Sequence, residues 1–282
     1  MIGVSGNPVA GVSRRPRLHH RVDGDGPRVL LLHPVGLDMR CFDPLAAELA
    51  REFTVLRVDL RGHGRSPAGS PAPALEDYAE DVHALLEEIG FLPTAVVGFS
   101  FGGMIGQLLA LDHPEDVSAL AICACASTLD PEGRRTLAER GTVAERSGMD
   151  AVLDVTMARW FSPGFLQQGH DRDVRGQLQA LDVRSWAEAW RAISALDAAA
   201  RLQEIDVPTL CLAGGADLSV PPDTMREASR RIRGSRFEVV AGASHMLFIE
   251  RHQEVAAILG DFLRAARAPR RTRVYVRSAR CR

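Results

Sequence analysis

The sequence predicts an α/β fold in which a mostly parallel, doubly wound sheet carries an inserted helical cap. Short β-rich apolar runs alternate with segments whose apolar residues recur at helical spacing. The runs are continuous rather than alternating, which is typical of strands covered by helices on both faces. Between residues 129 and 202 the strand-like runs stop, and this stretch holds all three tryptophans. With 282 residues, of which 46% are hydrophobic, the chain is long enough to bury a sizeable core.

The expected elements follow from these patterns in chain order. The weakly alternating residues 17–22 and the Asp- and Gly-rich turn 23–27 predict a hairpin that leads into the next strand. The segment 75–89 repeats apolar residues at helical spacing with Glu and Asp between them, and so predicts an amphipathic helix. We expect further strands at residues 29–32, 54–58, 95–97, 117–125, 209–213 and 237–240, and further helices at 44–51, 104–111 and 253–266.

The chain divides into four parts on this interpretation. Residues 1–16, rich in Gly, Pro and Ser, form a flexible N-terminal segment. Residues 17–128 and 203–263 form the sheet and its helices, and residues 129–202 form the cap over the strand ends. The last 19 residues, 264–282, carry eight arginines and no acidic residue, and we expect them to form a disordered basic tail.

Composition argues against several classes of protein. The formal net charge is −2, and because the tail is strongly basic, the remainder of the chain is acidic, unlike a nucleic-acid-binding domain. No apolar stretch is long enough to cross a membrane, and no secretory signal is evident. The five cysteines lack the spacing of metal ligands and fit a reducing compartment. We therefore expect a cytoplasmic protein that binds neither nucleic acid nor a membrane; a homodimer stays open.

The motif Gly98-Phe99-Ser100-Phe101-Gly102-Gly103 lies between an expected strand and an expected helix. This is the context of a nucleophile elbow, in which flanking glycines allow a sharp turn that exposes the serine hydroxyl at the end of the strand. A plainer interpretation is a Gly-rich turn around an ordinary helix-capping serine. Other residues must therefore decide between the two.

A catalytic base and an acid are expected in two later loops. Asp217 follows the strand that ends near residue 213, and His245 follows the strand 237–240, so both lie at the same sheet edge as Ser100. The chain order Ser, Asp, His is the order of a serine hydrolase triad on this kind of sheet. Asp130, which follows the strand 117–125, is the competing acid.

Two backbone N–H groups are expected to form an oxyanion hole. One belongs to Phe101, directly after the serine, and the other to Val35 in the loop 33–38. Pro34 has no N–H and cannot contribute. We expect His33 to brace this loop rather than to act in catalysis.

Four motifs together resemble the α/β-hydrolase superfamily: residues 33–36 (His-Pro-Val-Gly), 59–66 (Asp-Leu-Arg-Gly-His-Gly-Arg-Ser), 98–106 around the serine, and 242–245 (Gly-Ala-Ser-His). Within it, the chain resembles the 3-oxoadipate enol-lactonases on residues 102–107, 159–163 and 206–210. The resemblance implies that residues 59–66 are structural. It also implies that a small-molecule lactone or ester is hydrolysed through an acyl-enzyme on Ser100, without a metal or an organic cofactor.

An enol-lactone of this kind carries a free carboxylate, so the resemblance implies a cation in the pocket. Arg159 and Arg191 in the cap are the candidates, although either can also be a solvated surface arginine. Trp160, Trp186 and Trp190 either line the pocket or only pack the cap helices together. The bulk of Phe101 and Phe248 is expected to narrow the pocket.

Two other functions stay open at this point. One is a carboxylesterase or natural-product tailoring hydrolase that acts on another substrate, and the other is a ligand-binding member of the fold without activity.

Overall fold

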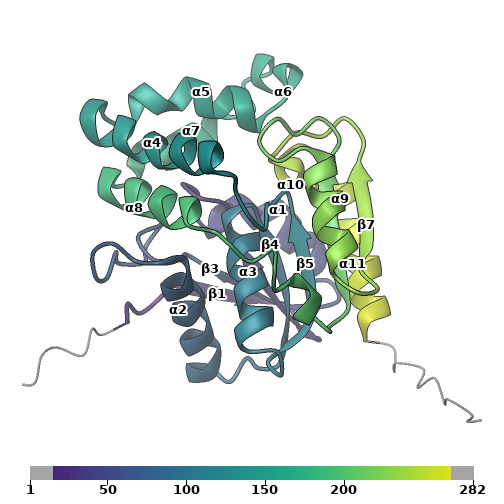
Figure 1. Ribbon diagram of the computed structural model, residues 1–282. Coiled ribbons are helices and arrows are strands. Elements are labelled where there is room, and N and C mark those ends of the chain that lie inside the picture. Colours follow the sequence, from purple (N-terminus) through teal and green to yellow (C-terminus); the bar gives the residue numbers. More distant parts are fainter. Residues whose placement is uncertain (1–14, 268–282) are drawn as a thin grey trace, which may run out of the picture.

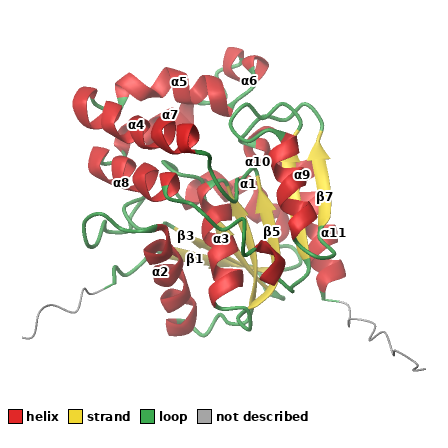
Figure 2. Cartoon of the chain, in the orientation of Figure 1, coloured by secondary structure: helices red, strands yellow, loops and turns green. Residues whose placement is uncertain are grey.

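The computed structural model describes residues 15–267, and it forms a seven-stranded sheet with helices on both faces (Figures 1 and 2). The strand order is β1-β3-β2-β4-β5-β6-β7. All neighbouring strands are parallel except β1, which pairs antiparallel with β3 at the edge. The strands are β1 (His20–Asp23), β2 (Arg28–Leu32), β3 (Thr54–Val58), β4 (Thr94–Phe99), β5 (Val117–Cys123), β6 (Thr209–Gly214) and β7 (Arg236–Val240). The predicted fold class is confirmed.

The helices cover the two faces of the sheet. On one face α2 and α3 pack together, and on the other α1 packs against α11 (Figure 1). The helices of the sheet domain are α1 (Asp43–Leu49), α2 (Leu75–Glu88), α3 (Phe101–Asp112), α9 (Pro222–Arg231), α10 (Leu247–Glu250) and α11 (His252–Ala266), with short 3-10 helices at Met39–Phe42 and Leu202–Glu204. None of the helices described is long and apolar enough to cross a membrane.

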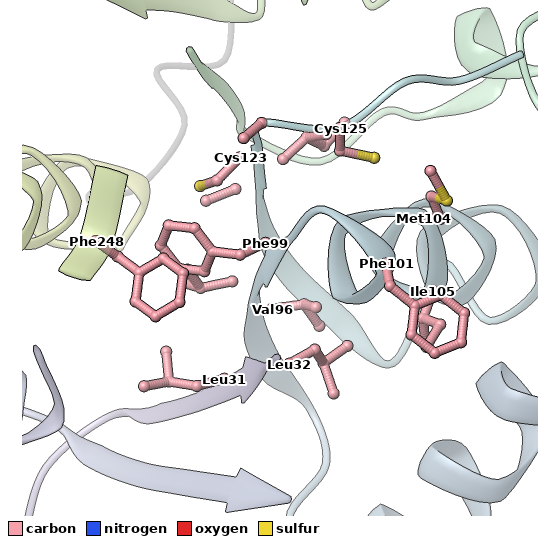
Figure 3. Packing of buried hydrophobic residues seen from close by; sticks show 14 of the residues in the cluster. Leu31, Leu32, Val96, Phe99, Phe101, Met104, Ile105, Cys123, Cys125 and Phe248 are labelled. Atoms are coloured by element: carbon pink, nitrogen blue, oxygen red, sulfur yellow. The ribbon is translucent and has the colours of Figure 1, made fainter. Parts of the chain in front are cut away.

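The central strands are buried on both faces, which explains their continuous apolar runs. Every residue of β4 is buried, and Phe99 and Val96 project to opposite sides of it (Figure 3). Phe99 packs against Phe248 with ring centroids 4.4 Å apart, whereas Val96 lies on the side of α3. β5 ends at Cys123, two residues before the expected end, because Ala124 takes a positive φ of 46° that breaks the extended backbone.

The expected hairpin between residues 17–22 and the next strand is wrong. β1 pairs with β3 instead, with His20 opposite Val58, and β3 lies between β1 and β2. The turn does reverse the chain, but it rests on the segment that connects α1 to β3. A Cβ on Gly24, whose φ is +82°, would lie 2.2 Å from the carbonyl oxygen of Phe53. The glycines therefore allow close backbone contact rather than a two-strand ribbon.

Between β5 and β6 the chain forms only helices, in the stretch expected to be the cap. They lie together on one side of the sheet domain (Figure 1). These helices are α4 (Pro131–Ser147), α5 (Asp150–Trp160), α6 (Pro163–Gln167), α7 (Arg172–Ala180) and α8 (Val183–Ser194). The cap contacts the sheet domain directly, since the Asp38 N–H donates to Gln177 Oε1 of α7 at 3.0 Å.

The expected terminal segments fall mostly outside the described residues. The flexible segment 1–16 overlaps the structure only at Arg15 and Pro16, and Arg15 pairs there with Glu80. The basic tail was expected from residue 264, but α11 continues to Ala266, and residues 268–282 lie outside the description.

Candidate active site

Ser100 stands at the turn between β4 and α3. Its backbone adopts φ 51° and ψ −114°, an unusual conformation for a residue with a side chain. The flanking glycines are required: a Cβ on Gly98 would lie 2.2 Å from the Gly102 carbonyl oxygen, and one on Gly102 would lie 2.1 Å from that of Leu32. The Ser100 hydroxyl caps no backbone N–H of α3, so the plainer helix-capping interpretation fails.

Three side chains from distant parts of the chain meet at this turn. His245 Nε2 lies 3.0 Å from Ser100 Oγ, and His245 Nδ1 lies 2.8 Å from Asp217 Oδ2. An ionised Asp217 only accepts hydrogen bonds, so Nδ1 carries the proton and Nε2 presents a lone pair to the serine hydroxyl. Both His245 and Asp217 are buried, whereas Ser100 is partly exposed. This arrangement can withdraw a proton from the hydroxyl as the hydroxyl attacks.

The Asp217 carboxylate is held on both oxygens. Oδ1 accepts the N–H groups of Ser219 at 2.7 Å and of Val220 at 2.9 Å, which leaves Oδ2 directed at the histidine. The competing acid, Asp130, lies elsewhere: it is the N-cap of α4 and accepts the Gly133 N–H at 2.6 Å. The structure thus brings Asp217, and not Asp130, to His245.

The loop that carries His245 is tied to the end of α5 in the cap. The carbonyl oxygen of Trp160 accepts the Ser244 hydroxyl at 2.7 Å and the Met246 N–H at 3.0 Å. The Glu250 carboxylate connects the same two segments, since Oε1 accepts the Ser162 N–H at 2.7 Å and Oε2 accepts the Ser244 N–H at 3.0 Å. Sequence reasoning missed Glu250, and its position in a four-residue helix gave no signal of this role.

The buried His33 side chain stabilises the loop 33–38 through two hydrogen bonds. Its Nδ1–H donates to the Pro34 carbonyl at 2.8 Å, and its Nε2 accepts the Leu60 N–H at 2.9 Å, so the ring is neutral. Burial lowers the pKa of His33 to about 4. Its own carbonyl oxygen accepts the Gly102 N–H at 3.1 Å, which joins the loop to the start of α3. His33 is therefore structural, as expected.

The N–H groups of Val35 and Phe101 flank this junction. Phe101 is the first residue of α3, so its N–H has no acceptor within the helix. In the part of the chain that the structure describes, the Val35 N–H has no hydrogen-bond acceptor either. Both donors are thus free to bind an oxygen atom next to Ser100.

The motif 59–66 serves the same loop. Asp59 is buried and accepts the Met39 N–H at 2.8 Å and the Arg65 N–H at 2.9 Å. The Ser66 hydroxyl donates to the Asp59 carbonyl oxygen at 2.6 Å. None of these contacts involves the reacting groups, which agrees with a structural role.

The structure separates the expected substrate-binding residues into two groups. Arg159 lies beside the loop that carries Asp217, because its Nη2 donates to the Leu218 carbonyl at 3.3 Å. Trp186 packs on the loop 33–38: a Cβ on Gly36 would lie 2.7 Å from its ring. Trp160 is buried, and its carbonyl oxygen accepts the hydrogen bonds from the loop that carries His245.

The other expected residues lie away from the reacting groups. Arg191 forms an ion pair with Glu145 between α8 and α4, and it is exposed, so its assignment to the substrate pocket is wrong. Phe248 is buried against Phe42 and Phe99 and belongs to the core (Figure 3). The Phe101 ring lies on the opposite side of β4 from Phe248 (Figure 3) and packs edge-on against Tyr78, with ring centroids 4.9 Å apart. Neither ring narrows the pocket as expected, because both fill the core.

One group of side chains has the composition of a metal site. His83, His113 and Asp116 lie together at the opposite, amino-terminal edge of the strands. One nitrogen of each ring is already engaged, since His83 Nε2 contacts Asp116 at 2.8 Å and His113 Nε2 contacts Glu80 at 2.7 Å. The two rings are stacked 3.6 Å apart and nearly parallel, so their in-plane lone pairs do not converge on one ion. We assign this group no part in the site.

Comparison with known proteins places the chain in a family. Residues 29–258 match the family described as the alpha/beta hydrolase family. The chain belongs to this family. It is 30% identical over 264 residues to a pimeloyl-[acyl-carrier protein] methyl ester esterase of Neisseria meningitidis, with 89% of this chain and 98% of the relative covered. It is 27% identical to 3-oxoadipate enol-lactonase 1 of Acinetobacter baylyi, with 86% of this chain and 90% of the relative covered.

Among solved structures, the enol-lactonase from Burkholderia xenovorans is similar along nearly its whole length. Its TM-score is 0.85 at 30% identity, with 90% of this chain and 99% of that chain covered. The predicted resemblance to α/β-hydrolases of the enol-lactonase type is confirmed. The chain is therefore an α/β hydrolase, related both to esterases and to enol-lactonases.

Proposed function

We propose that this α/β hydrolase cleaves a small-molecule lactone or carboxylic ester through an acyl-enzyme on Ser100. The observation that carries the proposal is the chain of contacts from Asp217 through His245 to Ser100, at 2.8 and 3.0 Å. A serine hydroxyl is a weak nucleophile alone, and an adjacent oriented base is what activates it.

The reaction follows from this geometry in two steps. Ser100 Oγ attacks the ester carbonyl while its proton passes to His245 Nε2, and the N–H groups of Val35 and Phe101 bind the oxyanion. The C–O bond to the alcohol then breaks as His245 returns the proton to the leaving oxygen. Water then attacks the acyl carbon while its proton passes to His245. The bond from that carbon to Ser100 Oγ breaks, His245 returns the proton to Oγ, and the carboxylic acid is released.

The relatives support two substrate types. The similar enol-lactonases, one of them known from a solved structure, favour a lactone such as that of 3-oxoadipate. The methyl ester esterases favour an open-chain ester as the alternative, either for a carboxylesterase or for a tailoring hydrolase. The four buried free cysteines of the described chain support a reducing, cytoplasmic setting.

Hydrolysis of p-nitrophenyl acetate by the wild type and by Ser100→Ala tests the reaction class. We expect the variant to lose activity by about a thousandfold or more, since residual rates then come from binding and the oxyanion hole alone. A fluorophosphonate should add to Ser100 in the wild type, as seen by mass spectrometry of the tryptic peptide. Activity that survives the substitution would refute the proposal, and a wild type inert to both reagents would indicate a ligand-binding protein instead.

Loss of ultraviolet absorbance on hydrolysis of 3-oxoadipate enol-lactone distinguishes the two substrate types. Faster turnover of this lactone than of simple methyl esters supports the lactonase assignment. The reverse preference supports the carboxylesterase.

A further inference from the structure

The edge of the sheet that β7 forms has no partner strand among residues 15–267. β7 pairs with β6 alone and lies at one margin of the molecule (Figure 2). Its register with β6 runs from Arg236 to Val240 without a bulge, and the strand contains no proline. Bulges and prolines are common features that keep an exposed sheet edge from pairing with another chain. Since β7 has neither, its outer edge can accept a further strand.

The backbone groups on this outer edge belong to Phe237 and Val239. The Val240 carbonyl oxygen accepts the N–H of Gly215, the residue after β6, at 2.9 Å, so Val240 directs its backbone groups toward β6. The direction of these groups alternates along a strand, and Phe237 and Val239 therefore direct theirs away from β6. The Val239 side chain is also exposed, at 39%, which is unusual for valine in a strand.

The side chains of β7 are arranged symmetrically about Phe237. On one face of the strand, Arg236 and Glu238 lie on either side of Phe237 and form an ion pair with each other. On the other face, the Phe237 ring is half-buried, with the Arg226 guanidinium of α9 at 4.5 Å from its centroid. A two-fold axis through Phe237 would therefore bring each of the two charges opposite its counter-charge in a second copy of the chain.

We propose that this protein forms a homodimer in which β7 pairs antiparallel with β7 of a second copy, with the two-fold axis at Phe237. Phe237 then exchanges backbone hydrogen bonds with the partner subunit's Phe237, and the Val239 N–H donates to the partner subunit's Ser235. Arg236 faces the partner subunit's Glu238, and opposite charges at facing positions stabilise a strand pair. The two sheets become one continuous sheet. This inference is independent of the proposed hydrolysis.

The charges select this register over the two adjacent ones. With the axis at Glu238, the two glutamates would face each other in a non-hydrogen-bonded pair, whose Cα atoms lie only about 4.5 Å apart. Like charges in directly opposite positions are destabilising. With the axis at Val239, Glu238 would face a valine and would have no counter-charge across the axis. Of the three registers, the one centred on Phe237 pairs both charges.

Exchange of the charges tests the dimer and its register. In sedimentation velocity we expect the full-length wild type to dimerise between about 1 and about 100 µM. Arg236→Glu places like charges opposite each other at two symmetric positions, and it should raise the dimer dissociation constant about tenfold or more. Combining it with Glu238→Arg makes the facing charges complementary again and should restore the dimer. Arg51→Glu, at an exposed arginine paired with Glu48 of α1, is the matched control and should leave the constant unchanged.

A cysteine at the axis reports the register independently of charge. Facing residues in a hydrogen-bonded antiparallel pair have Cα atoms about 5.5 Å apart, within the range of a disulfide. Under mild oxidation, Phe237→Cys should therefore form a disulfide between two copies, identified by mass spectrometry of the linked peptides. Val239→Cys is the matched control on the same face of β7. It should not form this disulfide, because position 239 faces Ser235 of the partner and not itself.

Circular dichroism checks that each variant is folded. A wild type that stays monomeric over the whole concentration range overturns the inference, and so does an edge that is covered by another part of the same chain, since it gives the same result. A dimer that Arg236→Glu leaves intact, or a disulfide that forms in Val239→Cys in preference to Phe237→Cys, also overturns it.

Discussion

Replacing Glu250 should damage catalysis even though its carboxylate touches none of the reacting groups. The side chain accepts one N–H from Ser162 in the cap and one from Ser244, the residue before His245. In Glu250→Ala both donors lose their acceptor, and the Ser244 residue is buried. In Glu250→Gln the amide oxygen can still accept one of the two N–H groups, but the NH₂ group faces the other N–H donor and cannot accept it.

The size of the effect follows from these two bonds. A hydrogen bond to a charged group contributes about 1.5 to 3 kcal/mol, and the partial exposure of Glu250 places both bonds at the lower end. We expect Glu250→Ala to lower the free energy of unfolding by about 3 kcal/mol and Glu250→Gln by about half of that. Each 1.4 kcal/mol of this loss that raises the activation free energy, by displacing the loop that carries His245, lowers kcat about tenfold.

Urea unfolding and steady-state hydrolysis of p-nitrophenyl acetate measure the two effects. The kcat should fall more than KM rises, because the change disturbs the serine–histidine geometry and not the groups that bind the substrate. Glu254→Gln, an exposed carboxylate in the first turn of α11, is the control and should behave as the wild type. If Glu250→Ala stays within about 0.5 kcal/mol and about twofold of wild type, the reasoning is refuted.

Three further substitutions or conditions have defined outcomes. Asp217→Asn should lower kcat by about 10³- to 10⁴-fold at unchanged stability, because an amide no longer selects the tautomer of His245 that accepts the serine proton; ester hydrolysis and thermal melting measure both. The pKa of buried His33 is lowered to about 4 while the unfolded chain titrates near the usual value, so the stability this ring confers is complete above about pH 6.5 and lost as the pH falls toward 4. Between about pH 7.5 and about pH 5, urea unfolding should show the wild type losing about 2 kcal/mol more than His33→Gln. Gly36→Ala should cost about 2 to 4 kcal/mol in urea unfolding, because φ is +83° and the new Cβ would lie 2.7 Å from the Trp186 ring.

Each of these has a result that contradicts it. Full activity of Asp217→Asn would remove Asp217 from the reaction. Equal acid sensitivity in the His33→Gln variant would mean that its ring is not the group that resists protonation. For Gly36 the matched control is Gly176→Ala in α7, where a Cβ meets nothing within 4 Å; equal stability of the two variants would contradict the close packing at Gly36.

Much of the fold was predictable because the signals are local. The strand 54–58 is observed as Thr54–Val58, since an apolar run bounded by turn residues marks a buried strand directly. Which strands lie next to each other in the sheet cannot be predicted from a short stretch of sequence. The turn 23–27 predicts a chain reversal, but that β3 enters between β1 and β2 depends on how the whole sheet assembles.

The same distinction holds within the site. Ser100, Asp217 and His245 could be located because each follows a strand at the same sheet edge, so topology alone brings them together. The cap offers no such rule. Arg159 and Arg191 look alike in the sequence, and only the packing of the cap places Arg159 Nη2 on the Leu218 carbonyl and pairs Arg191 with Glu145.

The hydrogen bonds between the end of α5 and the loop that carries His245 have a consequence for engineering this hydrolase. The Trp160 carbonyl accepts hydrogen bonds from Ser244 and Met246, and the Ser162 N–H donates to Glu250, so the cap supports the loop that carries His245. A chimera that takes its cap from a relative to acquire a new specificity would keep its turnover only if the graft preserved this junction. A graft with its junctions after β5 and before β6 would bring in only the cap side of these contacts. The grafted cap would therefore have to fit Ser244 and Glu250 of the recipient.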